Sequence, residues 1–370
     1  MFWLLAICII VNSATYSQEL AYIFVGGKYG YINKIGEIAI TPIYTNAHGF
    51  NEGLALVRDS LRWAGYIDKT GKYIIKPKFG QADDFSEGLA CVEDVKLGYG
   101  YIDKKGKYII PPKYNVARRF SEGLAAVRFN GWWGFIDKTG RIIIKPNFID
   151  VNFSGFKNGR IRVNYVDISK DNILRASDAM LRGATPSQIW RFDHKNAFIN
   201  RNGNIAINLD SLAGGHDTGQ DEFDEFSEGL RAFEKLEKFG YIDTTGKIVI
   251  EPLFDCAFRF SEGVAAVKID NKWGFIEKTG KYVIEPKFTA VGSYHEGFAK
   301  VQIECSRSGR GAYGFVNRKG EIVVAPAYYS VRDFSCGLAA IESDNGQWGF
   351  IDTTGNMVIE PIFDYVGDFK

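Results

Sequence analysis

A glycine-rich acidic stretch, residues 214–225, gathers the residue types that could bind a metal. It contains His216, Asp217, Asp221 and Glu222. Carboxylate oxygens at short spacing are the ligands that calcium takes in loops. The Asp-x-Asp-x-Asp-Gly register of a calcium loop is absent from this stretch, however. We therefore interpret it as a solvated loop, keep these four residues as binding candidates, and predict no metal and no cofactor.

Catalytic signatures are missing from the sequence. Its four histidines, His48, His194, His216 and His295, form no metal-binding spacing such as HExxH. No GxSxG nucleophile elbow, phosphate-binding P-loop or GxGxxG turn between a strand and a helix occurs. Because neither a nucleophile with its base nor a metal site can be assembled, the sequence predicts a protein that is not an enzyme.

The composition narrows the classes of partner. The 370 residues include 45 Lys and Arg against 44 Asp and Glu, so the formal charge is +1. A near-neutral chain has no electrostatic attraction to nucleic acid, which we exclude as a partner. Apolar residues make up 46%, which argues against disorder. The 41 glycines and 15% aromatic residues predict many tight turns between short, ring-packed strands.

The amino terminus predicts export. Residues 2–11 (FWLLAICIIV) form an apolar run that is too short to cross a bilayer of ~30 Å but fits a secretory signal. We predict a signal peptide over residues 1–17 and a periplasmic, cell-surface or secreted protein, with a buried first strand as the alternative. No later run is long enough to span a membrane.

The cysteines form no disulfide framework. One possible disulfide pair remains open, Cys305 with Cys336.

One pattern recurs along the chain. It starts at Gly30, Gly65, Gly100, Gly134, Gly240, Gly274, Gly314 and Gly349, and a degenerate copy without proline starts at Ala197. The copy at Gly134 reads GFIDKTGRIIIKPNF, and the copy at Gly274 reads GFIEKTGKYVIEPKF. Successive regular copies lie 34 or 35 residues apart, so the basic unit has about 35 residues.

Each copy predicts a β-hairpin. The turn DKTG fits a type I turn whose glycine, Gly140 or Gly280, adopts a left-handed conformation that only glycine takes easily. Pro146 and Pro286 should end the second strand, because proline cannot donate to a ladder. A large ring precedes the strand glycine in the pairs Trp133-Gly134, Trp273-Gly274 and Trp348-Gly349. Glycine there predicts close approach by another backbone, which the ring covers.

A second motif, FSEGLAAV or a variant of it, follows most copies. It begins at Phe50, Phe85, Phe120, Phe226, Phe260, Tyr294 and Phe334. Its LAAV part predicts a third strand, and its FSEG part a corner. A glutamate recurring in this corner could form a catalytic or ligand-binding series. We favour a structural role, since a carboxylate that accepts backbone N–H groups at a turn recurs for the same reason as the glycine.

The combined pattern WG(F/Y)ID, KTGKY(V/I)I, PxF and FSEGLA(A)V resembles the WG-repeat, or KWG-repeat, proteins of bacteria. The resemblance covers roughly residues 26–370, apart from an interruption after the fourth copy. It implies a β-rich repeat that is common in exported or surface proteins. It supplies no catalytic residues.

The sequence thus predicts an all-β array of about nine three-stranded antiparallel meanders, each of about 35 residues. Repeats occupy residues 18–153 and 226–370, and residues 154–225 form an irregular insertion with a degenerate repeat near 197–207. A curved solenoid or superhelix is the preferred arrangement. A closed, propeller-like toroid is the alternative, because the half units at the two ends could pair.

The predicted function is that of an exported, non-enzymatic binding or scaffold protein that engages a protein or a surface glycan through its repeat loops. Exposed aromatic residues at the turns would favour a glycan, because rings stack on sugars, whereas mixed charged loops would favour a protein. An enzyme with its site in residues 154–225 and a purely structural envelope component are the alternatives.

Overall fold

The protein is described by a computed structural model, which covers residues 19–166, 194–209, 226–303 and 312–370. No helix in these ranges is long and apolar enough to cross a membrane. The strands form eight hydrogen-bonded sheets, of which the seven-stranded sheet spans two repeat units. The described residues therefore make nine units, which we number 1 to 9 along the chain. This confirms the all-β tandem array that the sequence predicts.

The strands of the first five units are as follows. Unit 1 contains β1 (Ala21–Val25), β2 (Lys28–Ile32), β3 (Ile38–Tyr44) and, from the other end of the chain, β33 (Tyr365–Val366). Unit 2 contains β4 (Asn46–Ala47), β5 (Ala55–Arg58), β6 (Ala64–Ile67) and β7 (Tyr73–Phe79). Unit 3 contains β8 (Ala90–Asp94), β9 (Gly98–Ile102) and β10 (Tyr108–Tyr114). Unit 4 contains β11 (Val116–Ala117), β12 (Ala125–Phe129), β13 (Trp132–Ile136) and β14 (Ile142–Val151), and unit 5 contains β15 (Arg160–Val166), β16 (His194–Asn200) and β17 (Ile205–Asn208).

The remaining four units repeat this order. Unit 6 contains β18 (Leu230–Lys235), β19 (Lys238–Asp243) and β20 (Ile248–Phe254). Unit 7 contains β21 (Cys256–Ala257), β22 (Val264–Ile269), β23 (Lys272–Glu277) and β24 (Tyr282–Phe288). Unit 8 contains β25 (Ala290–Val291), β26 (Phe298–Gln302), β27 (Tyr313–Asn317) and β28 (Ile322–Tyr328). Unit 9 contains β29 (Ser330–Val331), β30 (Leu338–Glu342), β31 (Trp348–Asp352) and β32 (Met357–Phe363).

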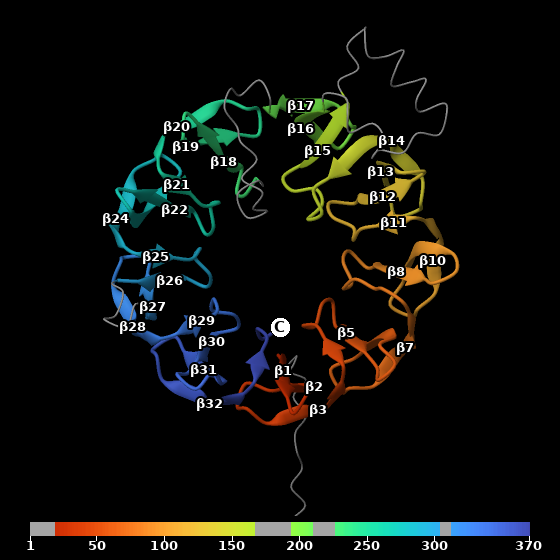
Figure 1. Cartoon of the computed structure of the whole chain (residues 1–370), viewed down its shortest axis with the longest axis horizontal. Helices are drawn as coiled ribbons and strands as arrows, with labels where there is room; N and C mark the ends of the chain where they lie inside the picture. Colours follow the sequence, from red (N-terminus) through yellow and green to blue (C-terminus); the bar gives the residue numbers. More distant parts are fainter. Residues whose placement is uncertain (1–18, 167–193, 210–225, 304–311) are drawn as a thin grey trace, which may run out of the picture.

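The nine units are arranged as a closed ring (Figure 1). Strand β1 pairs with β2 on one side and with β33 on the other, with Ile23 opposite Val366. Leu20 and Lys370 also exchange two backbone hydrogen bonds, of 3.1 and 3.2 Å. The chain adopts the closed toroid, which the sequence analysis gave as the alternative to the preferred curved solenoid, because segments from its two ends complete one sheet.

Most units have a fourth strand that the sequence analysis did not predict. In five units a two-residue strand lies next to the strand that follows the FSEG corner, as in the order β4-β5-β6-β7, and in unit 1 the two-residue strand β33 lies next to β1. This short strand faces the inside of the ring, whereas the proline-bearing strand lies on the outside (Figure 1). The segment between the PxF and FSEG motifs therefore forms the inner edge strand of the sheet. The three longer strands are as predicted.

The prolines lie inside the outermost strands and do not end them, which corrects the prediction for Pro146 and Pro286. In unit 4, Trp133 pairs with Phe148 and Phe135 with Ile144, so the outer strand carries extra residues between these pairs. Proline is tolerated in such a bulge because its nitrogen is not needed by the ladder.

The strand glycine faces this bulge. A Cβ on Gly134 would lie 2.7 Å from the oxygen of Ile144 and 2.7 Å from the nitrogen of Pro146. Other copies show the same approach, including those at Gly274 and Gly349. The predicted reason for this glycine, close approach by another backbone, is confirmed. The turn glycines Gly140 and Gly280 have φ of 83° and 86°, also as predicted.

The hydrophobic core lies between neighbouring units. One cluster joins Phe275 and Phe288 of unit 7 to Tyr294 and Val301 of unit 8. The aromatic residue of each corner reaches back to a ring of the preceding unit, as in the pair Phe275 and Tyr294, whose centroids are 5.0 Å apart. Each unit is thus completed by the next one, which is the way repeat arrays gain stability.

Residues 154–225, which the sequence analysis set apart, contribute β15, β16 and β17 to the ring. The degenerate copy near 197–207 occupies β16 and β17. The segment Phe156-Lys157-Asn158-Gly159 takes the place of the FSEG corner, and Asn158 has φ of 51°. We did not find this corner in the sequence because Lys-Asn replaces Ser-Glu there.

Candidate functional site

The FSEG corner is a two-residue hairpin turn. Ser86 and Leu89 exchange two backbone hydrogen bonds, of 2.9 and 3.2 Å. The two residues between them, Glu87 and Gly88, both have positive φ, 54° and 88°. A turn with two left-handed residues favours glycine, asparagine or aspartate. A glutamate at the first position therefore needs another explanation, and the contacts of its carboxylate provide one.

The corner glutamates link successive units around the ring. The Glu87 carboxylate accepts the backbone N–H of Gly123 in the next corner at 3.0 Å and pairs with Lys138 Nζ at 3.1 Å. The same Glu-to-Gly bond joins Glu52 to Gly88, Glu122 to Gly159, Glu228 to Gly263, Glu262 to Gly297 and Glu296 to Gly337. These contacts confirm the structural role that we favoured for this glutamate. We call the series the corner ladder.

Replacing Glu87 by alanine is expected to lower the free energy of unfolding by about 1–2 kcal/mol, because one charge-assisted hydrogen bond between units is lost. Urea denaturation followed by circular dichroism measures the change. Glu360→Ala is the matched control: Glu360 is exposed, and its substitution should change stability by less than about 0.5 kcal/mol. Equal stabilities for the two variants would contradict a stabilising corner ladder.

The two residues just before the corner aromatic differ from unit to unit, although the corner itself is nearly constant. We call them the variable dipeptide. In the described corners of this regular form they are His48-Gly49, Asp83-Asp84, Arg118-Arg119, Phe258-Arg259, Gly292-Ser293, Arg332-Asp333 and Gly367-Asp368. Their non-glycine members are half-buried, except for the exposed Arg119. The chemical character of this part of the ring therefore changes at every step.

Charges of the variable dipeptides interact across unit boundaries. His48 Nδ1 lies 3.0 Å from Asp84 Oδ1 in the next unit, and Arg332 lies 3.5 Å from Asp368. Burial raises the pKa of Asp83, and the charge of Asp84 adds to this, while Arg118 opposes it. The acidic variable dipeptide of unit 3 thus lies beside the basic variable dipeptide of unit 4, and the ring presents both signs of charge.

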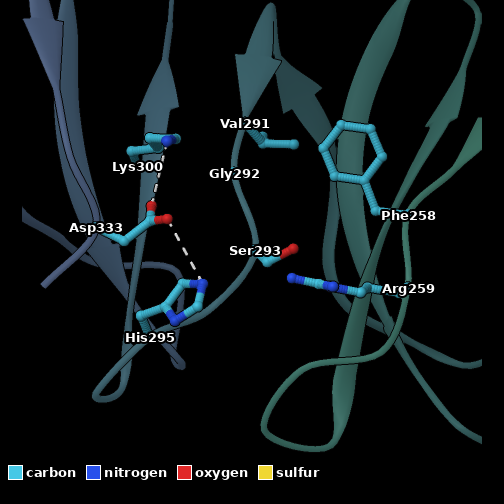
Figure 2. Close-up of a pocket in the computed structure, with 8 residues that line it drawn as sticks. All are labelled: Phe258, Arg259, Val291, Gly292, Ser293, His295, Lys300 and Asp333. Carbon is cyan, nitrogen blue, oxygen red and sulfur yellow. Dashed lines mark ion pairs between the residues drawn. The ribbon is translucent and has the colours of Figure 1, made fainter. Parts of the chain in front are cut away.

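A pocket of about 220 Å³ opens among units 7, 8 and 9 (Figure 2). It is lined by Phe258, Arg259, Val291, Gly292, Ser293, His295, Lys300 and Asp333. The small residues Gly292 and Ser293 occupy the variable dipeptide of unit 8, so no large side chain fills this space. Asp333 pairs with Lys300 at 3.3 Å and with His295 at 3.5 Å.

A related pocket of about 290 Å³ lies among units 1, 2 and 3. Its lining includes His48, Gly49, Asp84 and Asp368, again with a glycine in the variable dipeptide of the middle unit. In both pockets a histidine of the middle unit pairs with the aspartate of the following variable dipeptide. Both pockets thus lie where the variable dipeptide of the middle unit contains a glycine.

The pocket among units 7, 8 and 9 does not have the geometry of a nucleophile with its base. Within the described ranges, no hydrogen bond joins Ser293 Oγ to the ring of His295, although the ring pairs with Asp333. No group of three His, Cys, Asp or Glu side chains among the described residues is placed to hold a metal. The arrangement can bind charged groups, and the chemistry it offers is that of hydrogen bonds and ion pairs.

The candidates His216, Asp217, Asp221 and Glu222 lie outside the described residues, as does Cys305. Cys336 is a free thiol. Sequence reasoning did not single out the variable dipeptides. An alignment of the repeats to one another contains the signal, because these two positions change while the aromatic and the glycine beside them stay the same.

A closed ring of small antiparallel sheets, each completed by its neighbour, defines a propeller-like repeat protein. The model of the WG containing repeat matches residues 29–60, 65–94, 99–131, 133–165, 239–273, 273–304, 313–346 and 348–370. The chain therefore belongs to the WG containing repeat family.

Two solved structures are similar in shape. The structure described as a eukaryotic initiation factor is 10% identical, covers 95% of this chain and 97% of its own, and has a TM-score of 0.51. The structure of BamB from Moraxella catarrhalis is 10% identical, with 88% and 89% covered and a TM-score of 0.37. The first likeness extends to the fold alone. The search of curated proteins found no match.

Proposed function

We propose that the chain is an exported, non-enzymatic binding or scaffold protein whose variable dipeptides contact a protein partner. One observation carries this proposal: the corner residues are held by contacts between units, while the dipeptide beside them changes in size and charge at each step. Residues that hold a repeat together stay constant along the array. Residues that vary on a rigid scaffold are the usual carriers of recognition.

The distribution of aromatic residues favours a protein over a glycan. Among the described residues, the large exposed aromatic side chains are Phe129, Phe153, Tyr329 and Tyr365. They occupy different positions in their repeats and do not form a regular series on one edge. The ring centroid of Phe153 lies 4.0 Å from the guanidinium carbon of Arg118, so an arginine already stacks on this ring. The mixed charges of the variable dipeptides suit the polar surface of a protein partner.

Export forms part of the proposal and rests on the apolar segment 2–11. Mass spectrometry of the protein isolated from its own cells tests it. We expect a mature chain that begins near residue 15 or 18 in the exported fraction. A cytosolic chain that retains Met1 would contradict export and leave the binding function to be judged separately.

Partner binding is tested by charge reversal on the ring. A partner isolated from the producing cells by affinity capture is purified and titrated against the wild-type chain and Arg119→Glu by calorimetry. Arg119 is exposed, so the variant should fold, and we expect a dissociation constant at least about tenfold weaker. Lys145→Glu, on the outermost strand, is the matched control and should bind as the wild type does. Equal affinities for all three chains would reject the variable dipeptides as the contact surface.

A further inference from the structure

We infer that the pocket among units 7, 8 and 9 receives an acidic side chain of a protein partner, with Arg259 as the residue that binds its carboxylate. The inference rests on the proposed function, because it gives the chemistry of one contact made by the same ring of variable dipeptides. It depends on three observations: Arg259 has no partner among the described residues, the pocket has a net positive charge, and the pocket is small.

Arg259 has no partner in the described part of the chain: its guanidinium makes no hydrogen bond and no ion pair there. The side chain is half-buried and points into the pocket beside Ser293 (Figure 2). A guanidinium in such a position has lost part of its hydration without a replacement. Its planar fork of N–H donors matches a carboxylate, which can accept two parallel hydrogen bonds.

The remaining charges of the pocket do not neutralise Arg259. Asp333 is the one acidic residue of the lining, and it is already shared by Lys300 and His295. Counting Arg259, Lys300 and Asp333, the pocket carries one net positive charge even when His295 is neutral. The hydroxyl of Ser293 adds a donor facing the same space (Figure 2). The pocket therefore favours an anion that can accept hydrogen bonds.

The size and place of the pocket favour a side chain over a free ligand. Its volume of about 220 Å³ is below the ~300–1,000 Å³ that is usual for sites of small molecules and cofactors. It lies directly at the variable dipeptides of units 7, 8 and 9, so a protein bound to this surface lies over the opening of the pocket. A carboxylate on a short side chain reaches Arg259 from there, while the rest of the partner stays on the surface.

The related pocket among units 1, 2 and 3 provides an internal comparison. Asp368 stands there at the position that Arg259 has in the first pocket, the second residue of the preceding variable dipeptide. Asp84 and Asp368 outnumber Lys370, so that pocket carries one net negative charge when His48 is neutral. The same architecture thus has opposite signs at two places, and only the pocket with Arg259 should accept an acidic side chain.

A labelled hexaglutamate peptide, titrated against the full chain and followed by fluorescence anisotropy, tests the inference. We expect the wild-type chain to bind it and Arg259→Gln to bind at least about tenfold more weakly, since a charge-assisted bidentate contact is lost. Arg259→Lys, which keeps the charge without the fork, should fall between them. Lys145→Gln, which removes an exposed cation on the outermost strand, is the matched control and should bind as the wild type does. A hexaglutamine peptide should not bind.

Three results would overturn the inference: an unchanged affinity for Arg259→Gln, an equal loss in Lys145→Gln, or equal binding of hexaglutamine. Failure here is distinct from failure of the proposed function. If Arg119→Glu still weakens the natural partner, the ring is a contact surface and only the acidic occupant of this pocket is wrong. If the affinity for the natural partner does not change with any charge reversal, the proposed function itself is wrong.

Discussion

Replacing Phe369 by alanine is expected to lower the free energy of unfolding by about 3–5 kcal/mol and to loosen the ring where its two ends meet. Phe369 is 1% exposed and packs in one cluster with Ala21 and Ile23 from the other end of the chain. Its ring centroid lies 4.9 Å from that of Phe350, and its carbonyl accepts the hydroxyl of Ser335. Removing the ring leaves a cavity at the point where only non-covalent contacts hold units together.

Phe85→Ala is the matched control for this variant. Phe85 takes the same corner position in unit 3, with its ring 4.9 Å from that of Tyr66, but there the backbone runs on without a break. Both variants should lose similar stability. Hydrogen exchange of β1 and β33 should rise in Phe369→Ala alone, and small-angle scattering should show a larger radius of gyration. Equal protection of these strands in the two variants would show that the closure does not depend on Phe369.

Replacing Gly274 by alanine should lower the free energy of unfolding by about 3 kcal/mol or more. The added Cβ would lie 2.6 Å from the oxygen of Ile284 and 2.8 Å from the nitrogen of Pro286. Both are backbone atoms of the paired strand, so the bulge would have to move and take its ladder with it. Urea denaturation gives the magnitude.

Gly263→Ala, in the same unit, separates this clash from the general cost of losing a glycine. Gly263 has φ of 84°, and no atom lies within 4 Å of an added Cβ. Only the backbone conformation is strained there, at roughly 1–2 kcal/mol. If Gly263→Ala proves the more destabilising of the two, the close approach of strands is not the reason for the strand glycine.

The repeat could be predicted from sequence because its signals are local. The turn glycine Gly140 is required by its own φ of 83°, and the strand glycine Gly134 by backbone atoms of the same unit. The closure could not be predicted in this way. It depends on the pairing of Ile23 with Val366, and on small rotations between successive units that add up around the ring. No short sequence pattern determines the total rotation around the ring, so the same repeat motif is compatible with a solenoid and with a toroid.

The site was harder to predict for a related reason. Arg259, Ser293 and Asp333 belong to three successive units, and each is an ordinary surface residue in its own repeat. Their meeting depends on how the units are stacked, and the lack of a partner for Arg259 appears only once all its neighbours are known. The proline in β24 shows the same limit, because the bulge that accepts Pro286 is defined by the opposite strand.

The sheet of unit 1 takes strands from both ends of the chain, and this has a consequence for synthesis. During translation β1, β2 and β3 are made before the strands of units 2 to 9, whereas β33 is made after them. Until then the edge of β1 and the apolar residues Ala21 and Ile23 have no cover. Unit 1 is therefore completed only after units 2 to 9 have been made, and a nascent chain carries one open edge until β33 is synthesised.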